Sequence, residues 1–444
     1  MSETRTYETT MQTGEDLNGY DRLKAFVVSD VHLNNHPYNR QEDLENPRRR
    51  NFRLFLSRLN EEIRSSDKVL LILNGDILDV TGSWFEEVMP WDADEAQVEA
   101  TLNKLVLEIL ENNLSTCQEL RQFLMNANNE IVYVFGNHDG LLQRFPSSQE
   151  VIRNFLAVES SDPAVGKRIG FASHFASEEL DLYTEHGHLL DPFNHAGIVQ
   201  PALGEVINIL IVNRFVELAV DRLRGNGYSE GFIARMHARL HDIEYLRPLA
   251  LVPVWIQTVA EQHAGHPESI GKRESVREIL ISVISQTLLD PEMMQYMTSQ
   301  LRLPKAFLRL VVKITLRLPA VLPVISFVTT KLVRRTHSNK YQYRAAQKIQ
   351  REKGYRLIAF GHTHIPGVQP LTENAYYFNT GSWKPVINLF KASKNNPVEL
   401  ETLIHDAQFN KVERSGILRL EKTDLRPSAP AEFSLQTVQS GVSG

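Results

Sequence analysis

The stretch IVYVFGNHD, residues 131–139, decides the fold because it joins an apolar run to a loop of metal-ligand residues. Its first five residues are β-branched or aromatic, which is typical of a buried strand. Asn137 and His138 follow at the position where open α/β sheets bind ligands, beyond the carboxyl end of a strand. The stretch therefore predicts a strand that presents ligand side chains at its C-terminal end.

The same pattern recurs along the chain. Short apolar runs at 25–28, 69–73, 182–184, 356–360 and 375–378 each precede a motif that contains Asp, Asn or His. The motifs at the six strand ends are Asp30-Val31-His32, Gly75-Asp76, Gly136-Asn137-His138-Asp139, His186-Gly187-His188, Gly361-His362-Thr363-His364 and Asn379-Thr380-Gly381-Ser382. We expect an α/β fold in which these ends converge at one edge.

Seven residues in these motifs have the side chains and spacing of metal ligands. Asp30 and His32 lie two residues apart and can face one cation, whereas Asp76 can bridge two. Carboxylate, amide and imidazole ligands without a thiolate favour Mn²⁺, with Fe²⁺ or Zn²⁺ as alternatives. Two such cations about 3.5–4 Å apart would lower the pKa of a bridging water and neutralise phosphoryl charge, which indicates a phosphoesterase. The predicted ligands are Asp30, His32, Asp76, Asn137, His186, His362 and His364.

Composition and charge are those of an ordinary soluble globular protein and name no partner. Of 444 residues, 42% are hydrophobic and 23% charged, with a net charge of -6. The single cysteine, Cys117, excludes an internal disulfide and fits a reducing compartment. The polar start lacks the features of a secretion signal, and no run reaches the roughly 20 apolar residues of a membrane span. We therefore expect a cytoplasmic protein.

The chain is expected to contain a catalytic domain, one long insertion and two tails. Strand and motif patterns occupy 21–195 and 355–421, whereas 196–354 has helical periodicity and few strand signals. We predict one catalytic domain interrupted by a large, mainly helical insertion near the rim of the site. The polar ends, 1–20 and 422–444, are expected to be flexible tails.

Positive charge is concentrated in the insertion. Residues 293–351 contain twelve Lys or Arg and no Asp or Glu, so the rest of the chain carries -18. In 304–318 basic residues recur every four positions among apolar ones, the pattern of a helix that lies in the headgroup region of an anionic membrane. We favour peripheral binding to the inner face of the membrane through 301–351 over a solvated basic face.

The ordered motifs resemble those of the calcineurin-like metallophosphoesterase superfamily, whose pattern runs D-x-H, G-D-x-x-D/E, G-N-H-D/E, H and G-H-x-H. The resemblance covers about 24–195 and 355–421. It implies a two-sheet α/β sandwich flanked by helices. It also implies that one metal is held by Asp30, His32, Asp76 and His364, and the other by Asp76, Asn137, His186 and His362.

The catalytic residues also follow from this resemblance. His138 matches the family residue that donates a proton or hydrogen bond to the leaving oxygen, with Asp139 as its orienting partner. The run 75–79, the pair His186 and His188, and 379–383 are similar to the UDP-2,3-diacylglucosamine pyrophosphohydrolase group, which has Arg at the position of His138. That group covers its site with a helical lid, which implies a lipid-linked or nucleotide-sugar-lipid substrate.

Other functions remain open on the residues alone. A nuclease or nucleotide phosphodiesterase uses the same metal site, although the basic segment is too apolar for a nucleic-acid face. A non-catalytic, membrane-recruited scaffold would keep the fold without the reaction. Asp79 is either a partner of a ligand histidine or a helix cap. His188 either contacts substrate phosphate or packs in its loop. Trp383 is expected to cover a sheet end.

Overall fold

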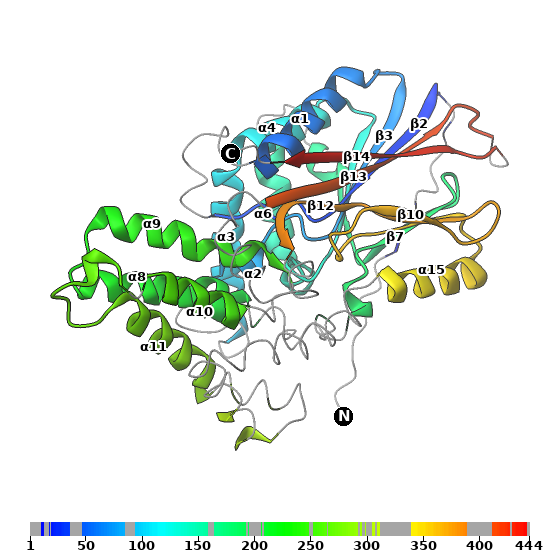
Figure 1. Cartoon of the computed structure of the whole chain (residues 1–444). Helices are drawn as coiled ribbons and strands as arrows, with labels where there is room; N and C mark the ends of the chain where they lie inside the picture. Colours follow the sequence, from blue (N-terminus) through cyan, green and yellow to red (C-terminus); the bar gives the residue numbers. More distant parts are fainter. Residues whose placement is uncertain are drawn as a thin grey trace. The chain divides into compact units, whose positions relative to one another are not determined.

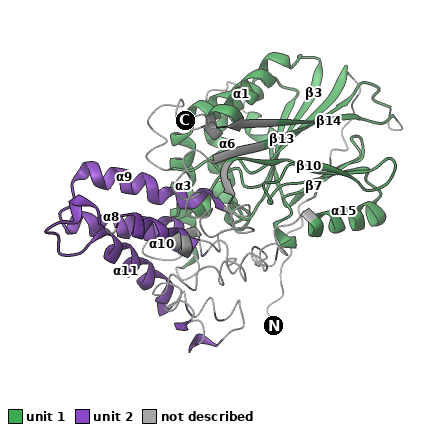
Figure 2. Cartoon of the chain, in the orientation of Figure 1, with its two compact units in different colours: residues 1–201, 338–385, 413–440 green, residues 202–337, 386–412, 441–444 purple. Residues whose placement is uncertain are grey.

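The chain forms two compact units in the computed structural model. The structure describes residues 10–12, 17, 19–35, 47–84, 94–158, 164–191, 194, 206, 208–247, 252–263, 265–291, 294, 298, 304–306, 309–310, 339–388, 411–426 and 429–441. Unit 1 comprises 1–201, 338–385 and 413–440, and unit 2 comprises 202–337, 386–412 and 441–444 (Figure 2).

Two mixed sheets form the frame of unit 1 (Figure 1). One sheet has the order β1-β6-β7-β9-β11-β10, and in the other β5-β4-β3-β2-β13-β12 are consecutive, with β14 beside β13. The strands of the first are β1 (Thr10–Gln12), β6 (His174–Ser177), β7 (Leu182–Glu185), β9 (Leu357–Phe360), β10 (Gly367–Pro370) and β11 (Tyr376–Asn379). Those of the second are β2 (Arg22–Val28), β3 (Asp67–Asn74), β4 (Asn129–Val134), β5 (Ile169–Ala172), β12 (Gly381–Asn388), β13 (Lys411–Lys422) and β14 (Glu432–Gly441).

Strand direction brings the motifs together. In the second sheet β2, β3 and β4 are parallel neighbours, and in the first sheet β7, β9 and β11 are parallel neighbours. In each sheet three strands that precede a motif therefore end at the same edge, as expected for an α/β sheet. Five of the six expected strands precede metal-ligand residues, and the sixth, β11, precedes the motif that begins at Asn379.

The core lies between the two sheets because alternate strand residues point toward the opposite sheet. Leu23, Ala25 and Val27 of β2 join Leu357 and Ala359 of β9 in one buried cluster. Further members are Leu70, Ile72, Val132, Val134, Phe175, Leu182, Phe378, Leu418 and Leu420. The expected two-sheet sandwich is thereby confirmed.

Helices cover the outer face of the second sheet. Phe55 of α1 (Pro47–Glu62) lies 6.3 Å, between ring centroids, from Phe26 of β2. Phe52 of the same helix lies 5.3 Å from Trp383, which is fully buried, as its expected structural role requires. The other helices of unit 1 before the insertion include α3 (Glu95–Asn112), α4 (Leu114–Leu124) and α6 (Pro146–Ala157).

One helix lies in a different part of the fold than expected. The sequence placed α15 (Asn339–Lys353) in the insertion, but it belongs to unit 1. Its buried Ala346 packs with Ile358 and Phe360 on the outer face of the first sheet, and Tyr377 Oη donates to Gln342 Oε1 at 2.7 Å. These contacts are long-range, so helical periodicity alone did not reveal them.

Unit 2 is mainly helical in its described residues. Helix α8 (Phe215–Gly225) packs against α9 (Glu230–His241) and α11 (Val276–Leu289), and α10 (Val252–Gln262) packs against α11. A short strand, β8 (Leu246–Arg247), pairs in parallel with residues 387–388 at the end of β12. Most of the apolar basic pattern at 304–318 lies outside the described residues.

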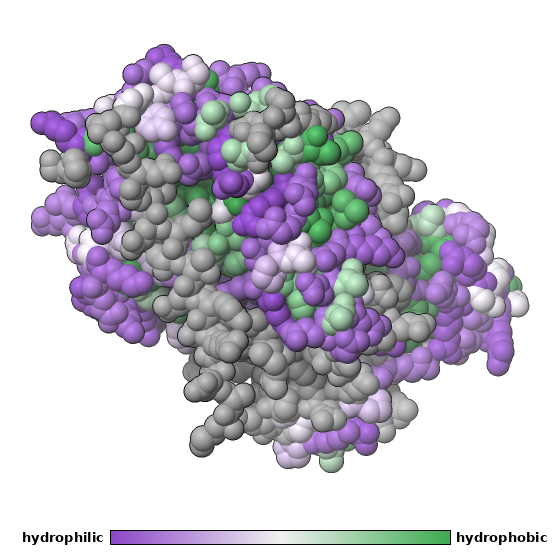
Figure 3. Space-filling model, turned by 180° about the vertical axis from the view of Figure 1, so that it is seen from behind, coloured by the Kyte–Doolittle hydropathy of each residue, from purple (hydrophilic) through white to green (hydrophobic). Residues whose placement is uncertain are grey.

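Both expected tails contain a strand. Strand β1 pairs in parallel with β6, and β14 pairs with β13, so these parts of 1–20 and 422–444 are not flexible tails. In β14, Leu435 packs against the core cluster, and the ring of Phe433 lies 5.0 Å from that of Tyr376. No described helix is long and apolar enough to span a membrane. The described surface on the face shown in Figure 3 is mainly hydrophilic, with apolar residues in small groups.

Candidate metal centre

The predicted ligands lie in tight loops directly after the strands. Five of the seven have a left-handed backbone, with φ of 55° at Asp30, 55° at His32, 54° at Asp76, 69° at His362 and 59° at His364. This conformation costs a non-glycine residue about 1–2 kcal/mol. The loops hold it through backbone hydrogen bonds, such as His32 N to Asp76 O at 2.9 Å and Asp30 N to Gly75 O at 3.0 Å.

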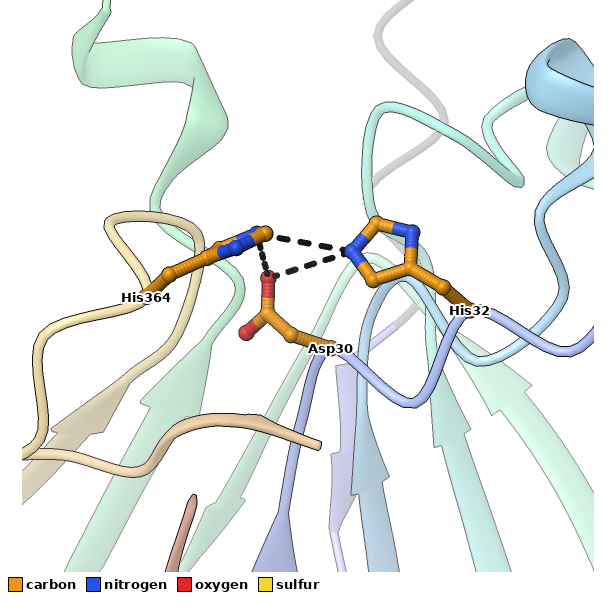
Figure 4. Close-up of side chains that lie close together, drawn as sticks. All are labelled: Asp30, His32 and His364. Atoms are coloured by element: carbon orange, nitrogen blue, oxygen red, sulfur yellow. Dashed lines mark hydrogen bonds and ion pairs between the residues drawn. The ribbon is translucent and has the colours of Figure 1, made fainter. Parts of the chain in front are cut away.

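One group of ligands gathers around Asp30 (Figure 4). His364 Nε2 lies 3.2 Å and His32 Nε2 lies 3.9 Å from Asp30 Oδ1, and the two imidazole nitrogens lie 3.4 Å apart. Asp76 Oδ2 lies 3.9 Å from His32 Nε2. These side chains come from loops after β2, β3 and β9, and their nitrogen and oxygen atoms point toward one space.

A second group of ligands includes Asp76 and His186. His186 Nε2 lies 3.2 Å from Asp76 Oδ2, and His186 Nδ1 donates to the backbone oxygen of Asn74 at 2.9 Å. His362 joins Asp76 and His186 within the reach of one metal ion, and its Nδ1 lies 3.0 Å from Asn137 Oδ1. Asp76 thus belongs to both groups, in the position of a shared carboxylate.

Three glycines let the loops approach the ligands this closely. A Cβ on Gly136 would stand 2.1 Å from Asp76 Oδ1, and one on Gly361 would stand 2.5 Å from Asp30 Oδ2. A Cβ on Gly75, whose φ is +84°, would stand 2.4 Å from His186 Nδ1. Since real Cβ atoms do not approach other atoms so closely, only glycine fits at these positions.

Burial and charge act in opposite directions on the ionisable ligands. Burial raises the pKa of Asp30, but the opposite effect of His186 and His364 is larger and brings the pKa down to about 2. The pKa of Asp76 is held well below its usual value because His186 and His138 outweigh the effect of burial. Burial lowers the pKa of His186, but Asp76 and Asp30 raise it to about 10. The carboxylates therefore stay ionised and stabilise positive charge between them.

His138 is oriented by a residue that the sequence assigned differently. The resemblance paired it with Asp139, but in the structure His138 Nδ1 lies 2.6 Å from Asp79 Oδ1. Asp79 also caps α2 (Val80–Ser83), because its Oδ1 accepts from Gly82 N at 2.9 Å, and its Oδ2 lies 3.5 Å from His32 Nδ1. The expected cap is thus present, and the same carboxylate approaches the proposed ligand His32.

A lysine that no motif predicted completes this arrangement. Lys384 Nζ donates to Asp79 Oδ2 at 3.3 Å, and both side chains are buried. Burial raises the pKa of Asp79, but His138 and Lys384 hold it well below its usual value. Burial lowers the pKa of His138, yet Asp79 and Asp76 raise it overall. Asp79 therefore favours a proton on the His138 ring.

Asp139 instead braces the loop that carries Asn137. Its Oδ1 accepts from Gly136 N at 2.6 Å, and its Oδ2 accepts from Tyr133 Oη at 2.6 Å and from Ile77 N at 2.9 Å. Burial and the nearby Asp76 raise the pKa of Asp139 to about 6. The hydrogen bonds tie the loop after β4 to the loop after β3.

Other supporting residues lie outside the predicted set. Asp191 Oδ2 lies 3.2 Å from His362 Nε2, although the sequence gave no signal for it. The motif after β11 supports the ligand loops: Asn379 Nδ2 donates to Gly361 O at 2.7 Å, and Ser382 Oγ donates to Asp30 O at 3.1 Å. His188 lies with its ring centroid 5.5 Å from that of His186.

The donor set fits divalent cations. Asp30 Oδ1 and His186 Nε2 are buried and make no hydrogen bond, although Asp30 Oδ1 lies 3.2 Å from His364 Nε2 and His186 Nε2 lies 3.2 Å from Asp76 Oδ2. Burial lowers the pKa of His32 to about 3, so its imidazole is neutral, whereas His186 holds a proton that a bound metal ion would displace. Buried oxygen and nitrogen ligands in two groups that share Asp76 indicate a site for two divalent metal ions.

The fold and this centre define a metal-dependent phosphoesterase. Residues 23–230 match the family model of the calcineurin-like phosphoesterases, so the chain carries a domain of this family, whose members are metal-dependent phosphohydrolases. The match ends before His362 and His364, which the fold brings to the same centre. No curated protein matches this chain.

Proposed function

We propose that the centre hydrolyses a phosphoester or pyrophosphate bond with two cations held as the resemblance implies. Asp30, His32, Asp76 and His364 hold one ion, and Asp76, Asn137, His186 and His362 hold the other. The main support for this proposal is the position of Asp76, whose Oδ2 lies 3.9 Å from His32 Nε2 and 3.2 Å from His186 Nε2. Two ions, Mn²⁺ by preference, would supply an activated water and neutralise phosphoryl charge.

His138 is the proposed general acid of the reaction. Its Nδ1 is engaged by Asp79, and its backbone N donates to Asp76 Oδ1 at 2.8 Å, which fixes the residue beside the ligands. Asp79 stabilises a protonated ring, and that proton can pass to the leaving oxygen. Lys384 restrains the second oxygen of Asp79, so the carboxylate keeps its orientation.

We propose a substrate with an apolar body attached to the phosphate. Leu189 and Ile365 support this, because they are 53% and 48% exposed and each lies within three residues of a proposed ligand, His186 or His364. Exposed apolar residues beside a polar centre favour contact with a lipid-like group. A lipid-linked or nucleotide-sugar-lipid phosphoester is therefore the proposed class.

We also propose that the protein acts at the inner, anionic surface of a membrane. Helix α15 supports this with an exposed basic face of Lys340, Arg344 and Lys348, opposite the buried Gln342 and Ala346. Basic residues near an anionic surface contribute about 1 kcal/mol each. The same basic face could also bind the phosphate backbone of a nucleic acid. The experiment must therefore distinguish a lipid phosphohydrolase from a nuclease.

The test compares hydrolysis of UDP-2,3-diacylglucosamine with that of bis-p-nitrophenyl phosphate, in Mn²⁺ and with a chelator control. Asp76→Asn should reduce both rates on the order of a thousandfold, because it removes the shared charged ligand. Asp181→Asn is the matched control, since Asp181 has φ 53° and binds Arg356 away from the centre. Full activity in Asp76→Asn with unchanged metal content would refute the proposed mechanism.

The substrate class has its own readout. Leu189→Ser with Ile365→Ser should raise KM for the lipid substrate and leave the diester KM unchanged. Equal effects on both substrates would exclude an apolar substrate contact. If the protein bound DNA in a salt-sensitive way and did not bind anionic vesicles, the proposed lipid substrate would be rejected in favour of a nuclease activity.

A further inference from the structure

A second cluster of metal-ligand side chains lies in unit 2. His237 Nε2 is 3.0 Å from Glu217 Oε1 and 3.0 Å from His241 Nε2, and His241 Nε2 is 3.9 Å from Glu217 Oε1. The two imidazole ring centroids lie 4.5 Å apart. Three potential ligand atoms thus converge within 4.8 Å, in a unit that contributes no ligand to the proposed dinuclear centre.

Helix geometry explains how this cluster forms. His237 and His241 are four residues apart on α9, so their side chains lie on the same face. Residues 226–229 join α8 to α9, and so short a connection makes the two helices antiparallel. The first turn of α8, which carries Glu217, therefore lies beside the last turns of α9.

The short contacts among these three atoms compete with one another for one proton. A neutral imidazole nitrogen carries either a proton or a lone pair. With a proton, His237 Nε2 can donate fully to only one of two neighbours at equal distance, and with a lone pair it faces the oxygen of Glu217 directly. A single cation bound to all three atoms satisfies each of them.

The distances also suit a tetrahedral ion. Zinc bonds to imidazole and carboxylate are about 2.0–2.2 Å long, which places neighbouring ligand atoms about 3.3 Å apart in a tetrahedron. The distances of 3.0, 3.0 and 3.9 Å lie on both sides of that value. Glu217 is 38% exposed, so water can reach the cluster and occupy the fourth position.

We propose that Glu217, His237 and His241 bind one divalent transition-metal ion of the zinc class, separate from the dinuclear centre. The ion joins the start of α8 to the end of α9. Zinc proteases of the His-Glu-x-x-His type have their catalytic base, a Glu, directly after the first histidine. In this chain that position is Ala238, which cannot act as a base. The site therefore stabilises the helical hairpin and carries no hydrolysis of its own.

The test measures zinc bound per full-length chain after metal removal, reloading with Zn²⁺ and gel filtration. His237→Gln with His241→Gln should bind one equivalent less than the wild type and keep its phosphoesterase activity. His263→Gln is the matched control, because His263 also lies in unit 2 but donates to Val259 O and lies outside the cluster. Equal zinc in the double variant and the control would overturn the proposal.

A second arm separates this site from the dinuclear centre and from misfolding. In an Asp76→Asn, His186→Asn background one equivalent should remain, and Co²⁺ should show the visible absorption of a tetrahedral site. Adding Glu217→Gln, which keeps the shape of the side chain, should weaken binding of that equivalent at least tenfold with unchanged helical circular dichroism. Unchanged cobalt absorption and affinity in that variant would reject Glu217 as a ligand.

Discussion

The proposed dinuclear centre of unit 1 and the proposed zinc site of unit 2 bring similar side chains together by opposite means. In unit 1 the ligands come from separate loops, and most of them have a left-handed backbone. In unit 2 Glu217, His237 and His241 lie on two regular helices. The first arrangement needs the whole sandwich, whereas the second needs one helical hairpin.

The two sites differ in how much folding free energy their geometry costs. Each left-handed ligand costs about 1–2 kcal/mol, and the loops keep it only because neighbouring hydrogen bonds and close packing leave no alternative. The helical cluster has no such strain, but Glu217 is 38% exposed and only helix packing positions it. We therefore expect unit 1 to respond sharply to small steric changes at its loops and unit 2 to respond to local helix stability.

The largest effect should follow a single added methyl group in unit 1. A Cβ at Gly136 would stand 2.1 Å from Asp76 Oδ1 and 2.5 Å from Asp76 N, so Gly136→Ala must displace the shared ligand. We expect a loss of kcat/KM on the order of a hundredfold or more and weaker metal binding. Steady-state kinetics and metal content check this.

Gly166→Ala is the control, because its Cβ would meet no atom closer than 3.7 Å. It should leave rate and metal content unchanged. If Gly136→Ala behaved like this control, the close fit of the ligand loops would not be needed for activity.

A smaller effect should follow Asp79→Asn. Its carboxylate holds His138 Nδ1 at 2.6 Å, and the amide keeps the shape but not the charge. We expect about a 10–100-fold lower kcat with unchanged metal content. The loss should be larger for an alkyl leaving group than for p-nitrophenolate, because the poorer leaving group needs the proton of His138 more. A loss independent of the leaving group would assign Asp79 a structural role only.

The sequence predicted where the candidate ligands would gather, because each lies within four residues of the end of an apolar run. Strand periodicity predicted the parallel strands, and parallel strands end at one edge. The predicted pairing of Asp139 with His138 relied on adjacency in the chain. In the structure the hydrogen bonds from Gly136 and Tyr133 direct the carboxylate of Asp139 elsewhere.

The features that sequence analysis missed depend on contacts between distant residues. Lys384 reaches Asp79 across 305 positions, and Asp191 reaches His362 across 171 positions, with no local pattern at either end. Strand β14 pairs with β13 despite little apolar patterning, and α15 was expected in the insertion because its packing partners, Ile358, Phe360 and Tyr377, follow it in the chain as parts of other elements. Periodicity identifies an element but not its partner.

The smallest effect tests unit 2 without touching either metal site. Ser275 caps α11 in a capping box: its Oγ accepts from Glu278 N at 3.3 Å, and the Glu278 side chain accepts from Ser275 N at 2.8 Å. Ser275→Ala should lower the free energy of unfolding by about 1 kcal/mol in urea denaturation and leave kcat unchanged. Ser285→Ala, which removes a bond to Ile281 O within the same helix, should change it by a few tenths at most. If Ser275→Ala lost as much activity as Asp79→Asn, the stability of unit 2 would control the dinuclear centre of unit 1. The two sites would then not differ in the way proposed here.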